Sequence, residues 1–151
     1  MKVVIQRSLE SNVKVDNKIV GSINKGLVIL VGFTYDDNEL IIDKMVDKII
    51  NLRIFEDENG VMNKSILESG GDILSISQFT LYADTKKGRR PSYINALNGE
   101  EATKLYDLFN KKLRNYVKVE TGVFGADMKV SILNDGPTTI IIESGDLSVK
   151  K

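Results

Sequence analysis

The chain has 151 residues, of which 42% are hydrophobic and 28% are charged. These proportions are typical of a single globular domain that can bury a substantial core. The 21 lysines and arginines balance the 21 aspartates and glutamates, so overall charge does not point to a nucleic-acid partner. Neither cysteine nor histidine occurs, which excludes thiol catalysis, disulfides, zinc–thiolate sites and histidine-dependent catalytic triads.

The sequence gives no sign of export or membrane insertion. The N-terminus lacks the cationic head, apolar run and cleavage site of a signal peptide. No apolar stretch approaches the length needed to span a bilayer. We therefore expect one domain over residues 1–151, located in the cytoplasm and without a membrane partner.

The N-terminal region is predicted to be rich in β-strands. Apolar residues predict a strand at Lys2–Gln6 and two short strands around Val13–Val15 and Ile19–Ile23, joined by a turn at Asp16-Asn17. The continuous apolar run Leu27–Val31 is typical of a strand that is covered on both faces.

A helix is predicted at Glu39–Asn51, because its apolar residues recur at helical spacing and its charged residues occupy the other face. Asp36 and Asp37 are expected to cap its N-terminus. A short strand at Arg53–Phe55 and a turn at Asp57–Gly60 are predicted to follow.

A polar strand is predicted over Asp72–Leu81, directly after Gly70-Gly71. Four of its uncharged side chains can form hydrogen bonds: Ser75, Ser77, Gln78 and Thr80. In a buried strand these groups need partners. Cross-strand hydrogen bonding and a polar site that lines a pocket both account for them.

A basic run follows, made of Lys86, Lys87, Arg89 and Arg90. A solvated loop and contact with phosphate groups both explain such a run. Pro91 permits a helix to begin just after it, so a short helix is predicted at Ser92–Leu97.

A second long helix is predicted to begin at Asn98, because Glu101 three residues later resembles a capping box. Apolar positions at helical spacing continue to Tyr116, and the aromatic side chains are expected in the core rather than stacked on bases. A strand is predicted at Val117–Glu120. In the loop Thr121–Ala126 glycines flank an apolar pair, and Phe124 suits either stacking on a flat ligand or a buried loop anchor.

The segment Leu133–Thr139 contains Asn-Asp-Gly-Pro between predicted strands at Asp127–Leu133 and Thr138–Glu143. A proline directly before a strand removes a hydrogen-bond donor, so a special backbone shape is predicted rather than an ordinary hairpin. The segment is either a rigid surface turn, or Gly136-Pro137 presents rigid backbone to a ligand. The polar tail from Gly145 is expected to fray.

Taken together and in order, these segments resemble the D-aminoacyl-tRNA deacylase family. Its two signature motifs are similar to Ser77–Leu81 and Asn134–Thr139, and its intervening segments to Lys87–Ser92 and Thr121–Met128. Its N-terminal part is similar to Gln6-Arg7 and Gly26–Gly32. The resemblance covers nearly the whole chain. It departs from the family at Ser11, where Ala is usual, and at Thr138, where Val or Phe is commoner, and both departures concern local packing.

The resemblance implies a mixed α/β fold in three layers, β/β/α, with the two long helices on one side. It implies hydrolysis of the ester that joins a D-amino acid, or glycine mischarged on tRNA-Ala, to the 3′-terminal adenosine of a tRNA. It also implies a homodimer in which each Gly136-Pro137 turn, with a cis peptide bond, enters the partner's pocket. No cofactor and no metal are assigned.

The resemblance further implies roles for particular residues. Ser77, Gln78, Phe79 and Thr80 would form the catalytic wall, with main-chain N–H groups near Phe79 and Thr80 as oxyanion donors and the substrate's 2′-hydroxyl assisting. The carbonyl groups of Gly136 and Pro137 would reject L side chains. The remaining roles are adenosine binding by Phe124, Gly125 and Ala126, support of the turn by Arg7, Asn134 and Thr139, and contact with tRNA phosphates by Lys86, Lys87, Arg89 and Arg90.

Two other classes of function stay open. One is a non-catalytic module that binds the aminoacylated 3′ end of tRNA on the same scaffold, and the other is a purely structural β-rich dimer. Direct attack by Thr80 is the less favoured route for the enzyme, because no base is identifiable beside it.

Overall fold

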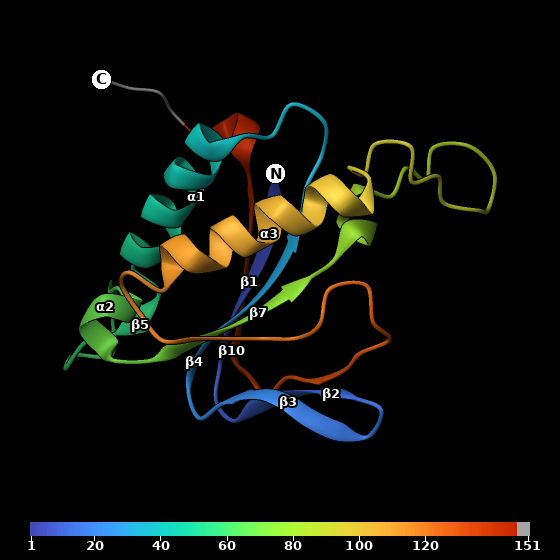
Figure 1. Ribbon diagram of the computed structural model, residues 1–151. Coiled ribbons are helices and arrows are strands. Elements are labelled where there is room, and N and C mark those ends of the chain that lie inside the picture. Colours follow the sequence, from blue (N-terminus) through green and yellow to red (C-terminus); the bar gives the residue numbers. More distant parts are fainter. Residues whose placement is uncertain (148–151) are drawn as a thin grey trace.

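The computed structural model describes residues 1–147 and is organised around a five-stranded sheet with the order β10-β1-β4-β7-β8 (Figure 1). Antiparallel pairing joins β1 to both of its neighbours, whereas β4, β7 and β8 run parallel to one another. The five strands are β1 (Lys2–Ser8), β4 (Gly26–Gly32), β7 (Asp72–Ser77), β8 (Val119–Thr121) and β10 (Asn134–Glu143).

The other elements form a smaller sheet, a hairpin and the helices. The smaller sheet has the order β3-β2-β9 and contains β2 (Ser11–Val15), β3 (Lys18–Ile23) and β9 (Lys129–Ser131). The hairpin pairs β5 (Phe55–Glu56) with β6 (Met62–Lys64). The helices are α1 (Glu39–Asn51), α2 (Ile66–Ser69), α3 (Gly99–Leu113) and two short 3-10 turns, η1 (Phe79–Tyr82) and η2 (Ser144–Asp146).

Strand β4 shows how the layers are built. Its side chains alternate between two cores: Leu27 and Ile29 belong to the large core with the helices, and Val28 belongs to the small core beneath the three-stranded sheet. Figure 1 shows α1 and α3 on one side of the large sheet and β2 and β3 on the other. The β/β/α arrangement, with the long helices on one side, is therefore confirmed.

Helix α1 has the predicted bounds, but its predicted cap was wrong. Asn38 is the N-cap, and its side chain accepts a hydrogen bond from the Ile41 N–H at 3.1 Å. Asp37 is occupied elsewhere, because its carboxylate accepts from the Thr34 N–H and from the Met1 ammonium group, both at 2.8 Å.

The polar strand was predicted to reach Leu81, but β7 ends at Ser77. Its parallel neighbour β4 ends at Gly32, and the Gln78 N–H donates to the Val31 carbonyl at 2.7 Å. With no further partner strand the chain turns into η1.

Two predictions around α3 were also wrong. Residues 92–97 form no helix, because Ser92 exchanges two backbone hydrogen bonds with Asp84, both 2.8 Å long, and so closes the basic loop. The helix itself ends at Leu113, which leaves Tyr116 54% exposed rather than in the core.

The Asn-Asp-Gly-Pro segment forms the start of β10, where its pairing with β1 is irregular, and is not the turn of a hairpin. The strand before it, β9, is shorter than predicted and pairs with β2, whereas β10 begins at Asn134 itself and pairs with β1. The peptide bond between Gly136 and Pro137 is cis. In the tail, Gly145 lies in η2, and residues 148–151 lie outside the described residues. None of the helices within residues 1–147 combines the length and apolar character that crossing a bilayer requires.

Candidate functional site

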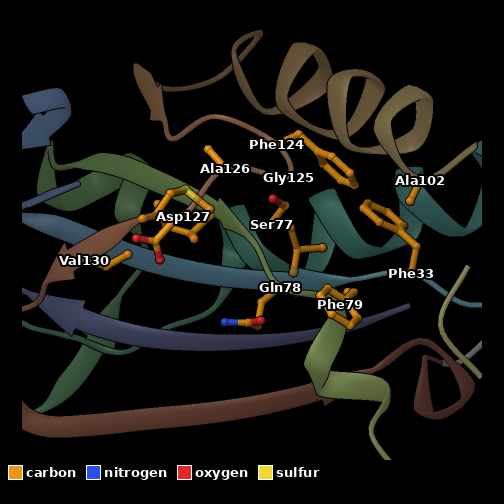
Figure 2. Close-up of a pocket in the computed structure, with 14 residues that line it drawn as sticks. Phe33, Ser77, Gln78, Phe79, Ala102, Phe124, Gly125, Ala126, Asp127 and Val130 are labelled. Atoms are coloured by element: carbon orange, nitrogen blue, oxygen red, sulfur yellow. The ribbon is translucent and has the colours of Figure 1, made fainter. Parts of the chain in front are cut away.

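A cavity of about 230 Å³ opens at the carboxyl ends of the parallel strands β4 and β7 (Figure 2). The register pairs Val31 with Ser77, so both strands deliver their last residues to the same place. Open α/β sheets commonly bind ligands at this edge. The lining consists of residues 31–33, 76–79, 102, 124–128 and 130.

Two of the predicted groups meet in this cavity. Ser77, Gln78 and Phe79 line it, and so do Phe124, Gly125 and Ala126, which lie across from them in Figure 2. Of the four polar side chains of the predicted strand, Ser77 and Gln78 line the pocket, whereas Ser75 is buried outside the lining.

Thr80 does not line the cavity. Its hydroxyl donates a hydrogen bond of 2.6 Å to the side-chain carbonyl oxygen of Gln78. This contact orients the Gln78 amide at the cavity wall, and it leaves the hydroxyl engaged with an amide rather than with a base.

Phe124 is held from behind by α3. Its ring centroid lies 5.8 Å from that of Tyr106, which is buried. Burial raises the pKa of the Tyr106 phenol, so its hydroxyl stays protonated and donates to the Ser75 carbonyl at 2.7 Å. Phe124 thus packs on Tyr106 as a half-buried loop anchor and also forms a wall of the cavity. Stacking of this ring on a flat ligand stays a prediction.

The Gly136-Pro137 turn is absent from the cavity lining of this chain. It is fixed by Asn134, whose side-chain NH₂ donates to the Arg7 and Thr138 carbonyl oxygens, both at 3.0 Å. The Asn134 side-chain oxygen accepts from Gln6 at 3.0 Å and from Thr139 at 3.3 Å. This side chain therefore uses its full hydrogen-bonding capacity to hold the turn.

Arg7 packs beneath the same turn. Its guanidinium group is buried, donates to the Ile54 carbonyl at 2.9 Å and lies 3.3 Å from the Asp135 carboxylate. The Arg7 Nε makes that ion pair by proximity, without the angles of a hydrogen bond. The turn is thus tied through one cation to the segment that follows α1.

The basic loop lies on the surface between η1 and α3. In Figure 1 this part of the chain projects away from the body of the molecule. Among residues 1–147, no carboxylate forms an ion pair with Lys86, Lys87, Arg89 or Arg90, and all four are exposed. Their charge is available to an anionic partner.

Sequence reasoning missed eight of the lining residues, among them Phe33, Ala102 and Asp127. A usable signal existed for Phe33, which directly follows the buried strand β4. Ala102 has the helical spacing of a core residue and is only 6% exposed, so periodicity could not single it out. Asp127 directly follows the predicted adenosine-binding segment and is the one ionisable side chain in the lining.

The fold and the cavity define an α/β protein whose cavity combines apolar walls with the short polar segment Ser77-Gln78. Within residues 1–147 no group of three carboxylate, histidine or cysteine side chains is arranged to hold a metal ion. Residues 4–143 match the family described as D-Tyr-tRNA(Tyr) deacylase. The chain belongs to this family, as the motifs Ser77–Leu81 and Asn134–Thr139 predict.

Similar proteins cover nearly the whole chain. It is 56% identical over 145 residues to a D-aminoacyl-tRNA deacylase of Brevibacillus brevis, covering 95% of this chain and 100% of the relative. A D-aminoacyl-tRNA deacylase of Clostridium botulinum strain 657 is 57% identical over 145 residues, with 95% and 97% covered.

Two solved structures share the fold. One is described as a c-Myc DNA Unwinding Element Binding Protein, with a TM-score of 0.90, 39% identity, and 95% of this chain and 98% of that chain covered. The other is described as a probable eukaryotic D-amino acid tRNA deacylase, with a TM-score of 0.79, 20% identity, and 93% and 97% covered. At 20% identity the second supports the fold alone.

Proposed function

We propose that the protein hydrolyses the ester bond of D-aminoacyl-tRNA, and of glycine mischarged on tRNA-Ala, to free tRNA and amino acid. Residues 1–151 act as one catalytic domain, a carboxylic ester hydrolase, in the cytoplasm where charged tRNA is used. The observation that carries the proposal is the cavity in which Ser77–Phe79 face Phe124–Ala126, in a chain 56% identical to a D-aminoacyl-tRNA deacylase.

The chemistry relies on positioning and on backbone donors. The first N–H groups of a helical turn have no acceptor within it, and Phe79 and Thr80 are the first residues of η1. These two N–H groups stabilise the oxyanion that develops on the ester carbonyl. The 2′-hydroxyl of the terminal adenosine assists the reaction, so the enzyme needs no histidine or cysteine. Ser77 and Gln78 orient the ester, and the Thr80 hydroxyl acts through Gln78.

Rejection of L-aminoacyl esters comes from rigid backbone. In a homodimer, each Gly136-Pro137 turn enters the partner's cavity and presents its two carbonyl oxygens. An L side chain collides with them, and a D side chain points to solvent. The support is the exposure of the turn, its absence from the lining of its own cavity, and its fixation by Asn134 and Arg7. The Pro137 carbonyl, 3.1 Å from the Thr139 hydroxyl, is an alternative acceptor for the one proton that this hydroxyl can donate to Asn134.

The rest of the substrate is held by the remaining groups. Phe124, Gly125 and Ala126 take the terminal adenosine, since a ring packed on Tyr106 gives a flat and fixed wall. The loop with Lys86, Lys87, Arg89 and Arg90 contacts tRNA phosphates.

The experiment that tests this function is hydrolysis of a matched pair, D-Tyr-tRNA and L-Tyr-tRNA, by the purified protein. We expect release of tyrosine from the D-ester while the L-ester is spared. Release from neither ester, with tRNA still bound, would favour the non-catalytic binding module. Equal release from both would mean an esterase without a stereochemical gate.

Neutralising the basic loop is expected to weaken tRNA binding and to reduce its salt dependence. The logarithm of the affinity falls linearly with the logarithm of the salt concentration. Each phosphate contact that is lost on a single strand makes this slope less steep by about 0.7. The test variant replaces all four cations of the loop with glutamine: Lys86→Gln, Lys87→Gln, Arg89→Gln and Arg90→Gln. The control variant carries Lys104→Gln and Lys111→Gln on α3. Affinity measured across a salt series should show a shallower slope for the first variant only. An unchanged slope would place the tRNA elsewhere.

A further inference from the structure

An apolar surface lies beside the mouth of the cavity. Phe79 is 54% exposed, Tyr93 is 41% exposed and Ile94 is 73% exposed. The rings of Phe79 and Tyr93 meet edge to face, with centroids 5.0 Å apart. Phe79 also lines the cavity, so these three residues, which we call the outer shelf, continue the cavity wall onto the surface.

Two hydrogen bonds hold the Tyr93-Ile94 part of the outer shelf in place, although residues 92–97 form no helix. The Thr34 hydroxyl donates to the Asn95 carbonyl at 2.6 Å, and the Leu97 N–H donates to the Phe33 carbonyl at 3.0 Å. Both anchors belong to the segment that follows β4, and Phe33 itself lines the cavity. The shelf is therefore held at a set place relative to the cavity, and little ordering is needed when a ligand binds.

The positive charge of the basic loop next to the outer shelf favours an anionic ligand. The paired backbone of Asp84 and Ser92 brings the basic loop directly beside Tyr93. Exposed aromatic faces next to unpaired cations are the combination that binds single-stranded nucleic acid, because bases stack on the rings and phosphates meet the cations. A double helix keeps its base faces covered and cannot use such a surface.

We propose that the outer shelf binds the unpaired nucleotides that precede the terminal adenosine of the substrate, with a base stacked on Tyr93. This inference rests on the proposed function, which places the terminal adenosine in the adjoining cavity. The path from the cavity over Phe79 and Tyr93 to the basic loop then follows one strand from its 3′ end toward its 5′ side. The shelf makes the enzyme sensitive to the nucleotides next to the reacting ester.

The test compares D-tyrosine esterified to adenosine with D-tyrosine esterified to the trinucleotide CCA. We expect kcat/KM of the natural protein to be at least about tenfold higher for the trinucleotide, given the usual strength of one base–aromatic contact. In Tyr93→Ala the ratio of the two kcat/KM values should fall toward one. Tyr93→Phe should restore it, because stacking needs the ring and not the hydroxyl.

The matched control is Tyr116→Ala, which removes a tyrosine of similar exposure beside Lys112 and Asp43, away from the cavity. It should keep the natural ratio. A natural protein that treats both esters alike, or a Tyr93→Ala variant that keeps the ratio, would overturn the inference. If neither ester nor D-Tyr-tRNA is hydrolysed, the proposed function fails. The shelf is then judged by the affinity of unacylated CCA, which Tyr93→Ala must weaken at least about tenfold for the inference to stand.

Discussion

Replacing Gly136 with alanine is expected to lower kcat/KM for D-Tyr-tRNA about 100-fold, equivalent to about 2.7 kcal/mol of transition-state stabilisation. Gly136 has φ of +120°, a conformation that L side chains rarely adopt. An added Cβ would lie 2.6 Å from the Thr138 hydroxyl and 2.8 Å from the Thr138 nitrogen. The hydroxyl could rotate away, but the Thr138 nitrogen is backbone and cannot move without it, so the two carbonyl groups of the turn must change direction. Steady-state kinetics with the D-ester and the L-ester measures the effect.

The control for this substitution is Gly60→Ala. Gly60 also has positive φ, +76°, but a Cβ there would meet nothing within 4 Å. It should cost about 1 kcal/mol of stability, because alanine is strained in that conformation, and it should leave kcat/KM unchanged. Full activity and full D/L discrimination in Gly136→Ala would show that the turn has no part in rejecting L-aminoacyl esters.

Replacing Arg7 with leucine is expected to lower the free energy of unfolding by about 2–3 kcal/mol. The buried guanidinium group satisfies the Ile54 carbonyl and neutralises Asp135, and leucine leaves both without a partner. Asp135 is 43% exposed, so water recovers part of the loss. Urea unfolding measures the change, and hydrolysis of D-Tyr-tRNA should fall together with it because the turn loses its support.

Arg53→Leu provides the comparison. The Arg53 guanidinium also bridges two acceptors, the backbone and side-chain oxygens of Asn63 at 3.0 Å and 2.7 Å, but it does so in solvent. Its loss should cost less than about 1 kcal/mol. An equal cost for the two variants would mean that the buried contacts of Arg7 add nothing to the stability of the turn.

The regular elements were predictable wherever a local pattern decided them. The bounds of α1 follow from the 3.6-residue period, and the doubly covered strand β4 follows from its unbroken apolar run. The cap of α1 was misplaced by one residue, because the tertiary partners of Asp37 lie at Met1 and Thr34. The helix predicted after Pro91 failed for a similar reason, since pairing between Asp84 and Ser92 outweighs a favourable start signal.

The motifs of the candidate site could be predicted from the sequence, but not all the residues that line the cavity could. Polar residues at the end of β7 and the glycine-flanked Phe124 carry their own signals. Ala102 does not, because a small residue on the buried face of α3 looks the same whether it faces the core or a cavity. The sequence pattern of one chain also could not predict whether the Gly136-Pro137 turn reaches a cavity, because the turn does not line the cavity of its own chain.

The position of β10 has a consequence for the order in which the chain is made. Synthesis delivers β1, β4, β7 and β8 before β10, so the sheet is complete only after β10 has emerged. Until β10 is added, one edge of β1 has no partner, and an unpaired edge invites pairing with other chains. The charged side chain of Lys2 on β1 discourages such association. The Gly136-Pro137 turn takes its shape in the same step, so the gate that we propose cannot form before residues 134–143 have been made.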